Sequence, residues 1–122
     1  MNTSSDPQEL TVRLMSIDST SSRETDVVEW LDRYLGERGW NTWRIPVSPG
    51  RDDLFATVAE NPVITLSTHL DTVPPYIAPR VTATAIHGRG SCDAKGVAAA
   101  MICAAEPVRR KICMPLPARS TM

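Results

Sequence analysis

The sequence predicts an α/β protein, specifically a three-layer sandwich around an open central sheet of mostly parallel or mixed strands. This prediction depends on the order of the hydrophobic patterns along the chain. The sequence contains two segments with helical periodicity, then three strand-like runs, a turn-rich loop and a third segment with helical periodicity. The composition agrees with a globular chain, because 42% of the 122 residues are hydrophobic and 22% are charged. The sequence contains no internal repeat that would point to another architecture.

The first helix is predicted to begin directly after Asp6. This aspartate is a favoured N-cap, Pro7 suits the first helical position, and an acidic residue follows within the first turn. Hydrophobic residues then recur at helical spacing, at Leu10, Leu14 and Ile17.

A second helix is predicted from a capping box that pairs Ser21 with Glu24. Its apolar face repeats at Val27, Val28, Leu31 and Leu35. Gly39 offers a C-terminal stop, so we expect this helix to end near Arg38.

Three strands are predicted next, over residues 42–47, 54–58 and 63–70, separated by the turn-forming sequences Ser48-Pro49-Gly50 and Asn61-Pro62. In the third run the hydrophobic residues fall on both parities, which is typical of an inner strand that is covered on both faces. We therefore expect residues 63–70 to be buried.

A further strand is predicted over residues 81–86, followed by a turn-rich loop and by a helix over residues 94–106 that Pro107 ends. From Pro107 onward the chain has four basic residues and no acidic one, together with three prolines. This shift in composition marks a boundary. We predict a folded unit over residues 1–106 and an irregular, basic, proline-rich tail over residues 107–122.

Charge and hydropathy exclude two classes of partner. A formal net charge of −1 gives no reason to expect a surface for nucleic acid or for anionic membranes. The longest apolar run, residues 97–105, is too short to span a bilayer, which needs about 20 residues. With three cysteines and no secretory leader before them, we expect reduced thiols and a cytoplasmic location.

His69 and Asp71 stand two residues apart at the end of the predicted strand 63–70. Their side chains therefore leave the same face, at the edge where open α/β sheets bind ligands. A carboxylate in this position can hold the second nitrogen of a metal-binding imidazole. The pair also fits a strand end followed by a turn, and a His-x-Asp pattern taken alone favours that simpler interpretation.

Asp93 supports a metal site, because it lies in a glycine-rich loop before a predicted helix, whose positive dipole end keeps the carboxylate ionised. A plain N-cap is its alternative role. A dinucleotide loop fits poorly, since the third glycine of G-x-G-x-x-G would fall at position 93, where a carboxylate repels pyrophosphate. A cation-binding loop fits better.

Three other residues are weaker candidates. Ser91 lacks the G-x-S-x-G pattern of a nucleophile elbow, and Cys92 has no base at a fixed spacing. His87 is predicted to be a strand-end residue, because no carboxylate lies two positions away.

Two segments together resemble the paired signatures S-x-H-x-D-x-V-P and G-R-G-x-x-D-x-K-G of the co-catalytic zinc amidohydrolases. They are Ser67-Thr68-His69-Leu70-Asp71-Thr72-Val73-Pro74 and Gly88-Arg89-Gly90-Ser91-Cys92-Asp93-Ala94-Lys95-Gly96. This family includes acetylornithine deacetylase, succinyl-diaminopimelate desuccinylase, aminoacylase and glutamate carboxypeptidase. The resemblance covers residues 6–106, which it identifies as the N-terminal part of the family's catalytic domain.

The resemblance implies a role for each residue. His69 would bind one zinc ion, Asp93 would bridge two, and Asp71 would be the active-site carboxylate that orients the His69 imidazole, with cobalt as a substitute for zinc. Two metal ions that share a carboxylate acidify a water for attack on an amide carbonyl. Lys95 and Arg89 would be charges that structure the loop.

The implied reaction is hydrolysis of the amide bond of a small N-acyl amino acid or peptide, of the acetylornithine deacetylase or desuccinylase type. The family also uses a Glu-Glu pair, a further acidic ligand, a late histidine and a lid domain that often dimerises. After Asp93 this sequence has only Glu106 as an acidic residue and no histidine. We therefore expect a truncated catalytic domain that is inactive alone, with an incomplete sheet that favours homo-oligomers. The alternative is a non-catalytic interaction module whose basic tail meets an acidic partner.

Overall fold

The computed structural model describes residues 6–20 and 23–117, and residues 1–5, 21–22 and 118–122 lie outside the description. The helices are α1 (Pro7–Met15), α2 (Thr25–Glu37), α3 (Lys95–Ala105) and the short 3₁₀ helix η1 (Glu106–Lys111). The strands are β1 (Asn41–Ser48), β2 (Arg51–Thr57), β3 (Ile64–Thr65), β4 (Arg80–Val81), β5 (Ile86–His87) and β6 (Ile112–Pro117).

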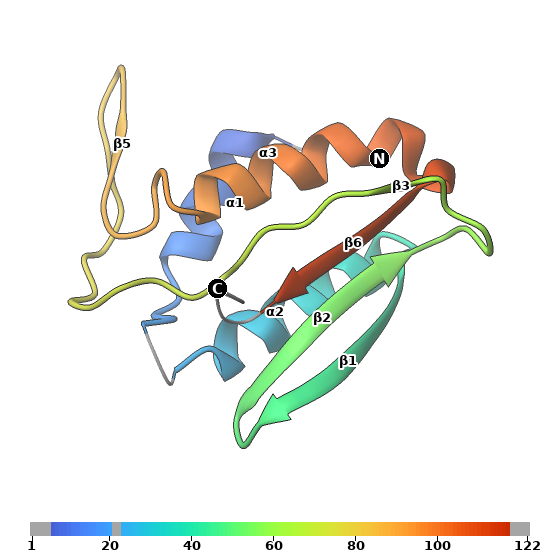
Figure 1. Cartoon of the computed structure of the whole chain (residues 1–122). Coiled ribbons are helices and arrows are strands. Elements are labelled where there is room, and N and C mark those ends of the chain that lie inside the picture. The colour runs from blue at the N-terminus through green and yellow to red at the C-terminus, as the bar shows by residue number, and fades with distance from the viewer. Residues whose placement is uncertain (1–5, 21–22, 118–122) are drawn as a thin grey trace.

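The central sheet is mixed and has the strand order β1-β2-β6-β3 (Figure 1). The neighbours β1 and β2, and β2 and β6, are antiparallel, whereas β3 runs parallel to β6. Strands β4 and β5 form a separate antiparallel hairpin. The predicted α/β class with an open mixed sheet is confirmed.

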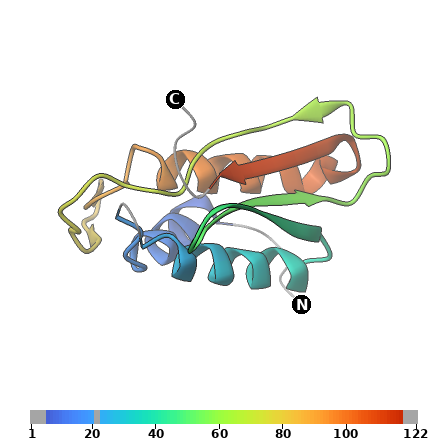
Figure 2. The same ribbon diagram turned by 60° about the horizontal axis from the view of Figure 1, so that its bottom comes forward.

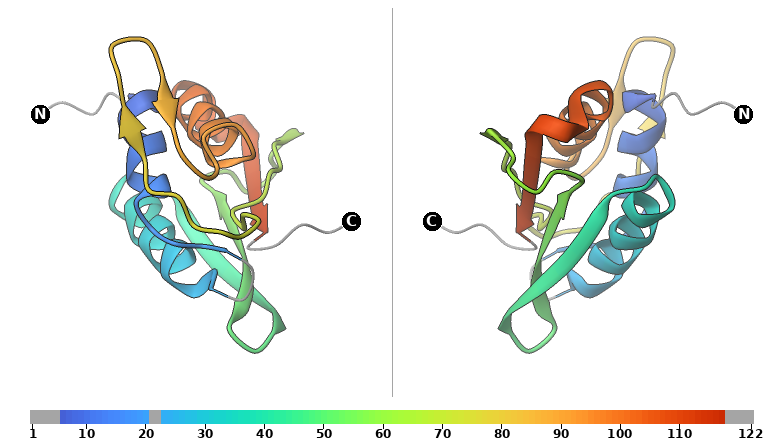
Figure 3. Two further views of the ribbon diagram at one scale, coloured as in Figure 1. Left: turned by 90° about the vertical axis from the view of Figure 1, so that its left-hand side faces the viewer. Right: turned by 90° about the vertical axis from the view of Figure 1, so that its right-hand side faces the viewer.

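The three α-helices lie on one side of the sheet (Figures 2 and 3). Alternate residues of β2 and β6 face these helices and are buried with them in one core: Leu54, Ala56, Ile112, Met114 and Leu116. On the opposite face the rings of Trp43 and Phe55 stack with their centroids 5.3 Å apart, and Trp43 is exposed. Over the described residues the sandwich thus consists of the sheet and one helical layer.

Local sequence signals set the ends of the first two helices. Asp6 accepts a hydrogen bond from the backbone N–H of Gln8 at 2.9 Å, and Pro7 is the first helical residue, as predicted. Helix α2 ends at Glu37, and Gly39 follows with φ of +90°, a conformation that favours glycine. The predicted capping box cannot be located, because Ser21 lies outside the described residues.

The prediction of a buried inner strand over residues 63–70 is wrong. Only Ile64–Thr65 forms regular strand, and 76% of Val63 and 46% of Ile64 are exposed. The physical reason is position, because β3 is the last strand of the described sheet and pairs with β6 alone. The predicted strand over residues 81–86 is likewise two short strands, since residues 82–85 form the turn of the β4–β5 hairpin.

The prediction of an irregular tail after residue 106 is also wrong. Residues 112–117 form β6, which lies between β2 and β3 (red in Figure 1). Ile112, Met114 and Leu116 alternate toward the core, and this alternation outweighs the prolines between them. The basic stretch before β6 is folded too, because Arg109 donates a hydrogen bond to the Arg38 carbonyl at 2.6 Å. An interaction through a free basic tail therefore has no support over these residues.

Candidate metal site

The segment that carries His69 runs beside β6 beyond the two residues of β3. The N–H of Leu66 donates to the Cys113 carbonyl at 3.0 Å, and the N–H of Leu70 donates to the Pro117 carbonyl at 3.1 Å. His69 therefore stands where the segment parallel to β6 ends, as the sequence predicts for a ligand-binding edge.

The turn after His69 is tied to the chain segment that follows α1. Ser19 donates through its hydroxyl to the Leu70 carbonyl at 2.7 Å, and the N–H of Thr72 donates to the Ser19 carbonyl at 3.0 Å. Thr20 and Thr72 form an isolated parallel bridge at the same place. These contacts hold the backbone on both sides of Asp71.

The glycine-rich loop closes onto the start of α3. The N–H groups of Lys95 and Gly96 donate to the Gly90 carbonyl at 3.0 and 3.2 Å. Helix α3 begins at Lys95, and no side chain caps its N-terminus. Asp93 is therefore not the plain N-cap that the sequence left open.

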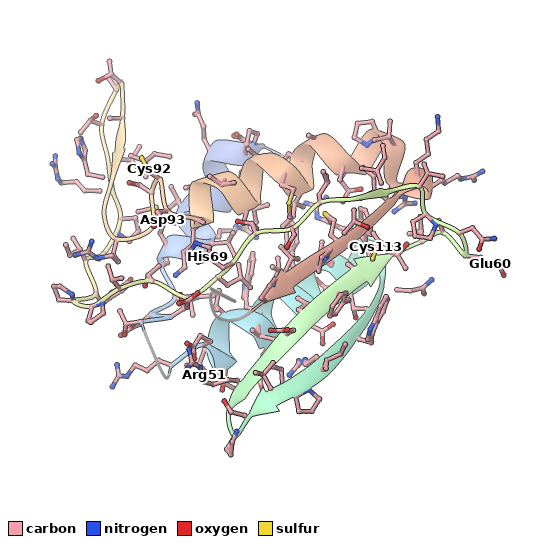
Figure 4. The ribbon with its side chains drawn as sticks, in the orientation of Figure 1. Arg51, Glu60, His69, Cys92, Asp93 and Cys113 are labelled. Atoms are coloured by element: carbon pink, nitrogen blue, oxygen red, sulfur yellow. The ribbon has the colours of Figure 1, made fainter. Side chains whose placement is uncertain are left out.

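The Asp93 carboxylate meets the His69 imidazole instead (Figure 4). His69 Nε2 lies 2.9 Å from Asp93 Oδ1, and His69 Nδ1 lies 3.1 Å from Asp71 Oδ1. The Asp71 side chain is 17% exposed and the Asp93 side chain is 85% exposed. The ring thus has one carboxylate behind it and another on the solvent side, and all three residues named from the sequence come together.

Lys95 and Arg89 hold backbone in place. Lys95 is 1% exposed and donates from Nζ to the Ile17 carbonyl at 2.7 Å. Burial lowers the pKa of Lys95 to about 8, although Asp18 acts in the opposite direction. Arg89 donates from Nε to the Pro75 carbonyl at 3.0 Å. Both contacts agree with the loop-structuring role that the resemblance implies.

The segment after α1 is a support that sequence reasoning missed. The Asp18 carboxylate accepts hydrogen bonds from the N–H and hydroxyl of Thr20 and from Arg23, and these contacts lower the pKa of Asp18. Tyr76 donates to the Met15 carbonyl at 2.9 Å, and burial raises the pKa of its hydroxyl. The Asp18 contacts are local, but Tyr76 and Lys95 bond to this part of the chain from 61 and 78 positions away, and no local pattern could have revealed those two contacts.

The weaker candidates lie apart from the imidazole. His87 is an exposed residue of β5, where it pairs with Arg80 across the hairpin. The Cys92 side chain is exposed in the loop before Asp93 (Figure 4). Neither residue shares a hydrogen bond with His69 within the part of the chain that the structure describes.

The His69 and Asp93 side chains are of the types that bind zinc, but two ligands are too few for a complete zinc site. An imidazole nitrogen and a carboxylate oxygen are ordinary zinc ligands. Residues 6–20 and 23–117 contain no cluster of three or more His, Cys, Asp or Glu side chains that could hold a metal ion. His69 and Asp93 can therefore supply part of a ligand set.

A comparison with protein families matches residues 65–115 to peptidase family M20/M25/M40, a segment that includes all three site residues. The chain belongs to this family. It holds part of the M20 catalytic domain, and members of the family typically bind zinc.

Curated relatives agree with the family. The chain is 36% identical over 94 residues to a peptidase M20 domain-containing protein of Schizosaccharomyces pombe, covering 73% of the chain and 24% of that relative. It is 35% identical over 98 residues to a [LysW]-lysine/[LysW]-ornithine hydrolase of Saccharolobus islandicus, and this match covers 80% of the chain and 27% of that relative. The chain thus spans about a quarter of the length of the curated relatives it matches.

Two solved structures share the fold of this chain. A tripeptidase from Staphylococcus aureus matches with a TM-score of 0.73 at 21% identity, over 90% of this chain and 35% of that one. The aminopeptidase PepT from Bacillus cereus matches with a TM-score of 0.74 at 20% identity, over 91% of this chain and 36% of that one. Among the described helices of this chain, none is both long and apolar enough to cross a membrane.

Proposed function

We propose that this chain carries part of a metal-dependent hydrolase site that cleaves the amide bond of N-acyl amino acids or short peptides. In this proposal His69 and Asp93 are metal ligands, and Asp71 orients His69. One observation carries it: the His69 imidazole lies between two carboxylates, at 3.1 Å from Asp71 and 2.9 Å from Asp93. Within the class we favour the acetylornithine deacetylase or succinyl-diaminopimelate desuccinylase type, in the cytoplasm.

The family supports a hydrolase acting on peptides or amino-acid derivatives. One curated relative is a probable carboxypeptidase of Ajellomyces capsulatus, 35% identical over 111 residues, and another is named as a hydrolase of LysW-linked lysine and ornithine. Because this chain spans only a quarter of such proteins, the substrate class is part of the proposal.

The chain's own residues prepare the imidazole for a ligand. With a metal ion bound, Asp71 would accept the Nδ1 proton of His69, and the lone pair of Nε2, on the side of the ring that faces Asp93, would be available to the metal. Because Asp71 is largely buried and its neighbours Leu70 and Thr72 are both hydrogen-bonded to Ser19, the ring is held in one orientation. Zinc, as two ions in the complete site or replaced by cobalt, would polarise the scissile carbonyl and acidify a water.

The described residues supply no second acid or base at the site. Asp71 is committed to the imidazole and lies behind it. Glu106, the only acidic residue after Asp93, accepts a hydrogen bond from Trp40 Nε1 at 3.1 Å, at the far end of α3. We therefore assign the general base and the remaining ligands of a complete enzyme to the portion of the relatives that this chain does not span.

Calorimetric zinc titration tests the ligand assignment. We expect weak binding by the full chain, and loss of most of that binding in His69→Ala and in Asp93→Ala. His87→Ala is the matched control, because it removes the other histidine of the sequence from an exposed strand. Unchanged zinc affinity in both site variants would show that the cluster is not a metal site.

A further inference from the structure

Ser19 holds the turn that carries Asp71 from both sides. Its hydroxyl donates to the Leu70 carbonyl at 2.7 Å, and its own carbonyl accepts the Thr72 N–H at 3.0 Å. In a parallel ladder a residue bonds to the two backbone groups that flank the residue opposite it, and Ser19 does this across Asp71 with its hydroxyl as the donor. Removing the hydroxyl therefore removes one of the two bonds that hold this turn.

The segment that contains Ser19 is also bonded to the half of the site that carries Asp93. The Ile17 carbonyl accepts a hydrogen bond from Lys95 Nζ at 2.7 Å, and Lys95 follows Asp93 by two positions. Lys95 is 1% exposed, so bulk water scarcely competes for this bond. Residues 17–19 therefore join two ligand-bearing segments whose site residues are 24 positions apart in the sequence.

The hydrogen bond from the Ser19 hydroxyl lies inside the fold. Ser19 and Leu70 are both 0% exposed. Bulk water therefore cannot replace the hydroxyl, and its loss leaves the Leu70 carbonyl without this donor. Because both groups are buried among described residues, their contact does not depend on what covers the surface of the chain.

We infer that Ser19 is a positioning residue for the metal site, which sets the orientation of the His69 imidazole through Asp71. Asp71 Oδ1 lies 3.1 Å from His69 Nδ1, and the Asp71 side chain is 17% exposed, so the carboxylate follows the backbone of its turn. When that turn loosens, the imidazole and the Asp93 carboxylate no longer offer a metal ion one prepared geometry. This inference rests on the proposed metal site.

A purely structural role is the competing explanation, because any serine hydroxyl that bonds to a carbonyl can stabilise a fold. Ser16 provides the matched control. Its hydroxyl donates to the Val12 carbonyl, also at 2.7 Å, but this bond is local to the end of α1. Ser16→Ala and Ser19→Ala thus remove the same group and a bond of the same length, and only Ser19→Ala removes a bond to the turn of Asp71.

Imidazole NMR of the full chain tests the inference, because the sequence contains only two histidines, His69 and His87. The variant His87→Ala assigns their ring signals. At fixed pH and without zinc, Ser19→Ala should shift the ring-nitrogen signals of His69 and leave those of His87 unchanged. Ser16→Ala should shift neither set of signals.

Titration with Zn²⁺, followed on the same ring signals, measures the consequence for binding. Loss of a group that directly holds a metal-binding imidazole typically costs about 10–100-fold in affinity. Ser19 acts one step behind Asp71, so Ser19→Ala should raise the zinc dissociation constant by a smaller factor, about 3–10-fold. Ser16→Ala should raise it by less than about twofold.

A double-mutant cycle separates positioning from a general loosening of the fold. In the Asp71→Ala background the carboxylate contact is absent, so Ser19→Ala should not shift the His69 ring signals further. A general loosening would shift them by the same amount in both backgrounds. Far-UV circular dichroism establishes that each variant folds. If Ser19→Ala does not fold, hydrogen exchange of the wild-type chain replaces it, and the Thr72 amide should be protected without zinc.

Three results would overturn the inference. One is zinc binding that depends on His69 and is equally tight in wild type and Ser19→Ala, which would leave the proposed metal site intact and remove Ser19 from it. The second is an equal ring shift with and without the Asp71 carboxylate. The third is free exchange of the Thr72 amide in the zinc-free wild type. Absence of any His69-dependent zinc binding would instead contradict the proposed function, and the zinc-free ring shifts would still decide whether Ser19 orients the imidazole.

Discussion

Gly96 is the position where α3 closes onto the loop that carries Asp93, and replacing it by alanine should damage both the fold and the metal site. A Cβ on Gly96 would lie 2.1 Å from the Ser91 carbonyl oxygen, and real Cβ contacts essentially never fall below 3.0 Å. The Lys95 and Gly96 N–H groups also donate to the Gly90 carbonyl from this turn. Alanine must therefore push the loop backbone outward by about 1 Å.

The expected cost follows from three contributions. Overpacking against a backbone atom costs about 1–3 kcal/mol. Weakening the two N–H donations to Gly90 costs about 1 kcal/mol each. The higher helix propensity of alanine relative to glycine stabilises the helix by about 1 kcal/mol and offsets part of this cost. Gly96→Ala should thus lower the free energy of unfolding by about 2–4 kcal/mol, which at about 4 °C per kcal/mol is a fall in Tm of roughly 8–16 °C.

Gly36 in α2 is the matched control, because a Cβ there would meet nothing within 4 Å. Gly36→Ala should raise the free energy of unfolding by about 0.5–1 kcal/mol. Thermal and urea unfolding followed by circular dichroism measure both variants, and zinc titration should show weaker binding only in Gly96→Ala. A Gly96→Ala variant with a Tm at or above that of the wild type would refute the reasoning.

Three further predictions concern the site. Asp71→Asn should weaken zinc affinity by about 10–100-fold in calorimetry, because the amide loses the charge that holds His69; equal affinity would remove Asp71 from the site. The folded chain loses the Lys95 proton near pH 8, whereas the unfolded chain keeps it to about pH 10.5, so the free energy of unfolding should rise over this range by about 3 kcal/mol. Urea unfolding of Lys95→Met should lack this rise, and a variant with the same pH dependence as the wild type would contradict the assignment. Finally, the chain should not hydrolyse N-acetylornithine or N-succinyl-diaminopimelate with added zinc or cobalt, because a general acid/base typically contributes about 10²–10⁴-fold. Chelator-sensitive turnover that Asp71→Ala abolishes would overturn this expectation, and would imply that a second copy completes the site.

Local signals in the sequence determined the helix ends and the composition of the candidate site. The Asp6–Pro7 start and the Gly39 stop depend on backbone groups within a few residues, and the structure places both as predicted. His69 and Asp93, which are 24 positions apart, are predicted together from two short sequence segments. The structure brings their side chains within 2.9 Å, because one segment ends beside β6 and the other folds back before α3.

Only the tertiary structure decided which strands are inside the sheet. The hydrophobic run 63–70 reads as an inner strand and lies at an edge, whereas the proline-rich residues 112–117 read as a tail and lie between two strands. Whether a strand is covered depends on which distant segments lie beside it. The hydrophobic pattern of the strand itself does not indicate which segments those are. The supports of the site depend on contacts of the same kind, since the Ile17 carbonyl accepts the buried Lys95 ammonium from a residue 78 positions away.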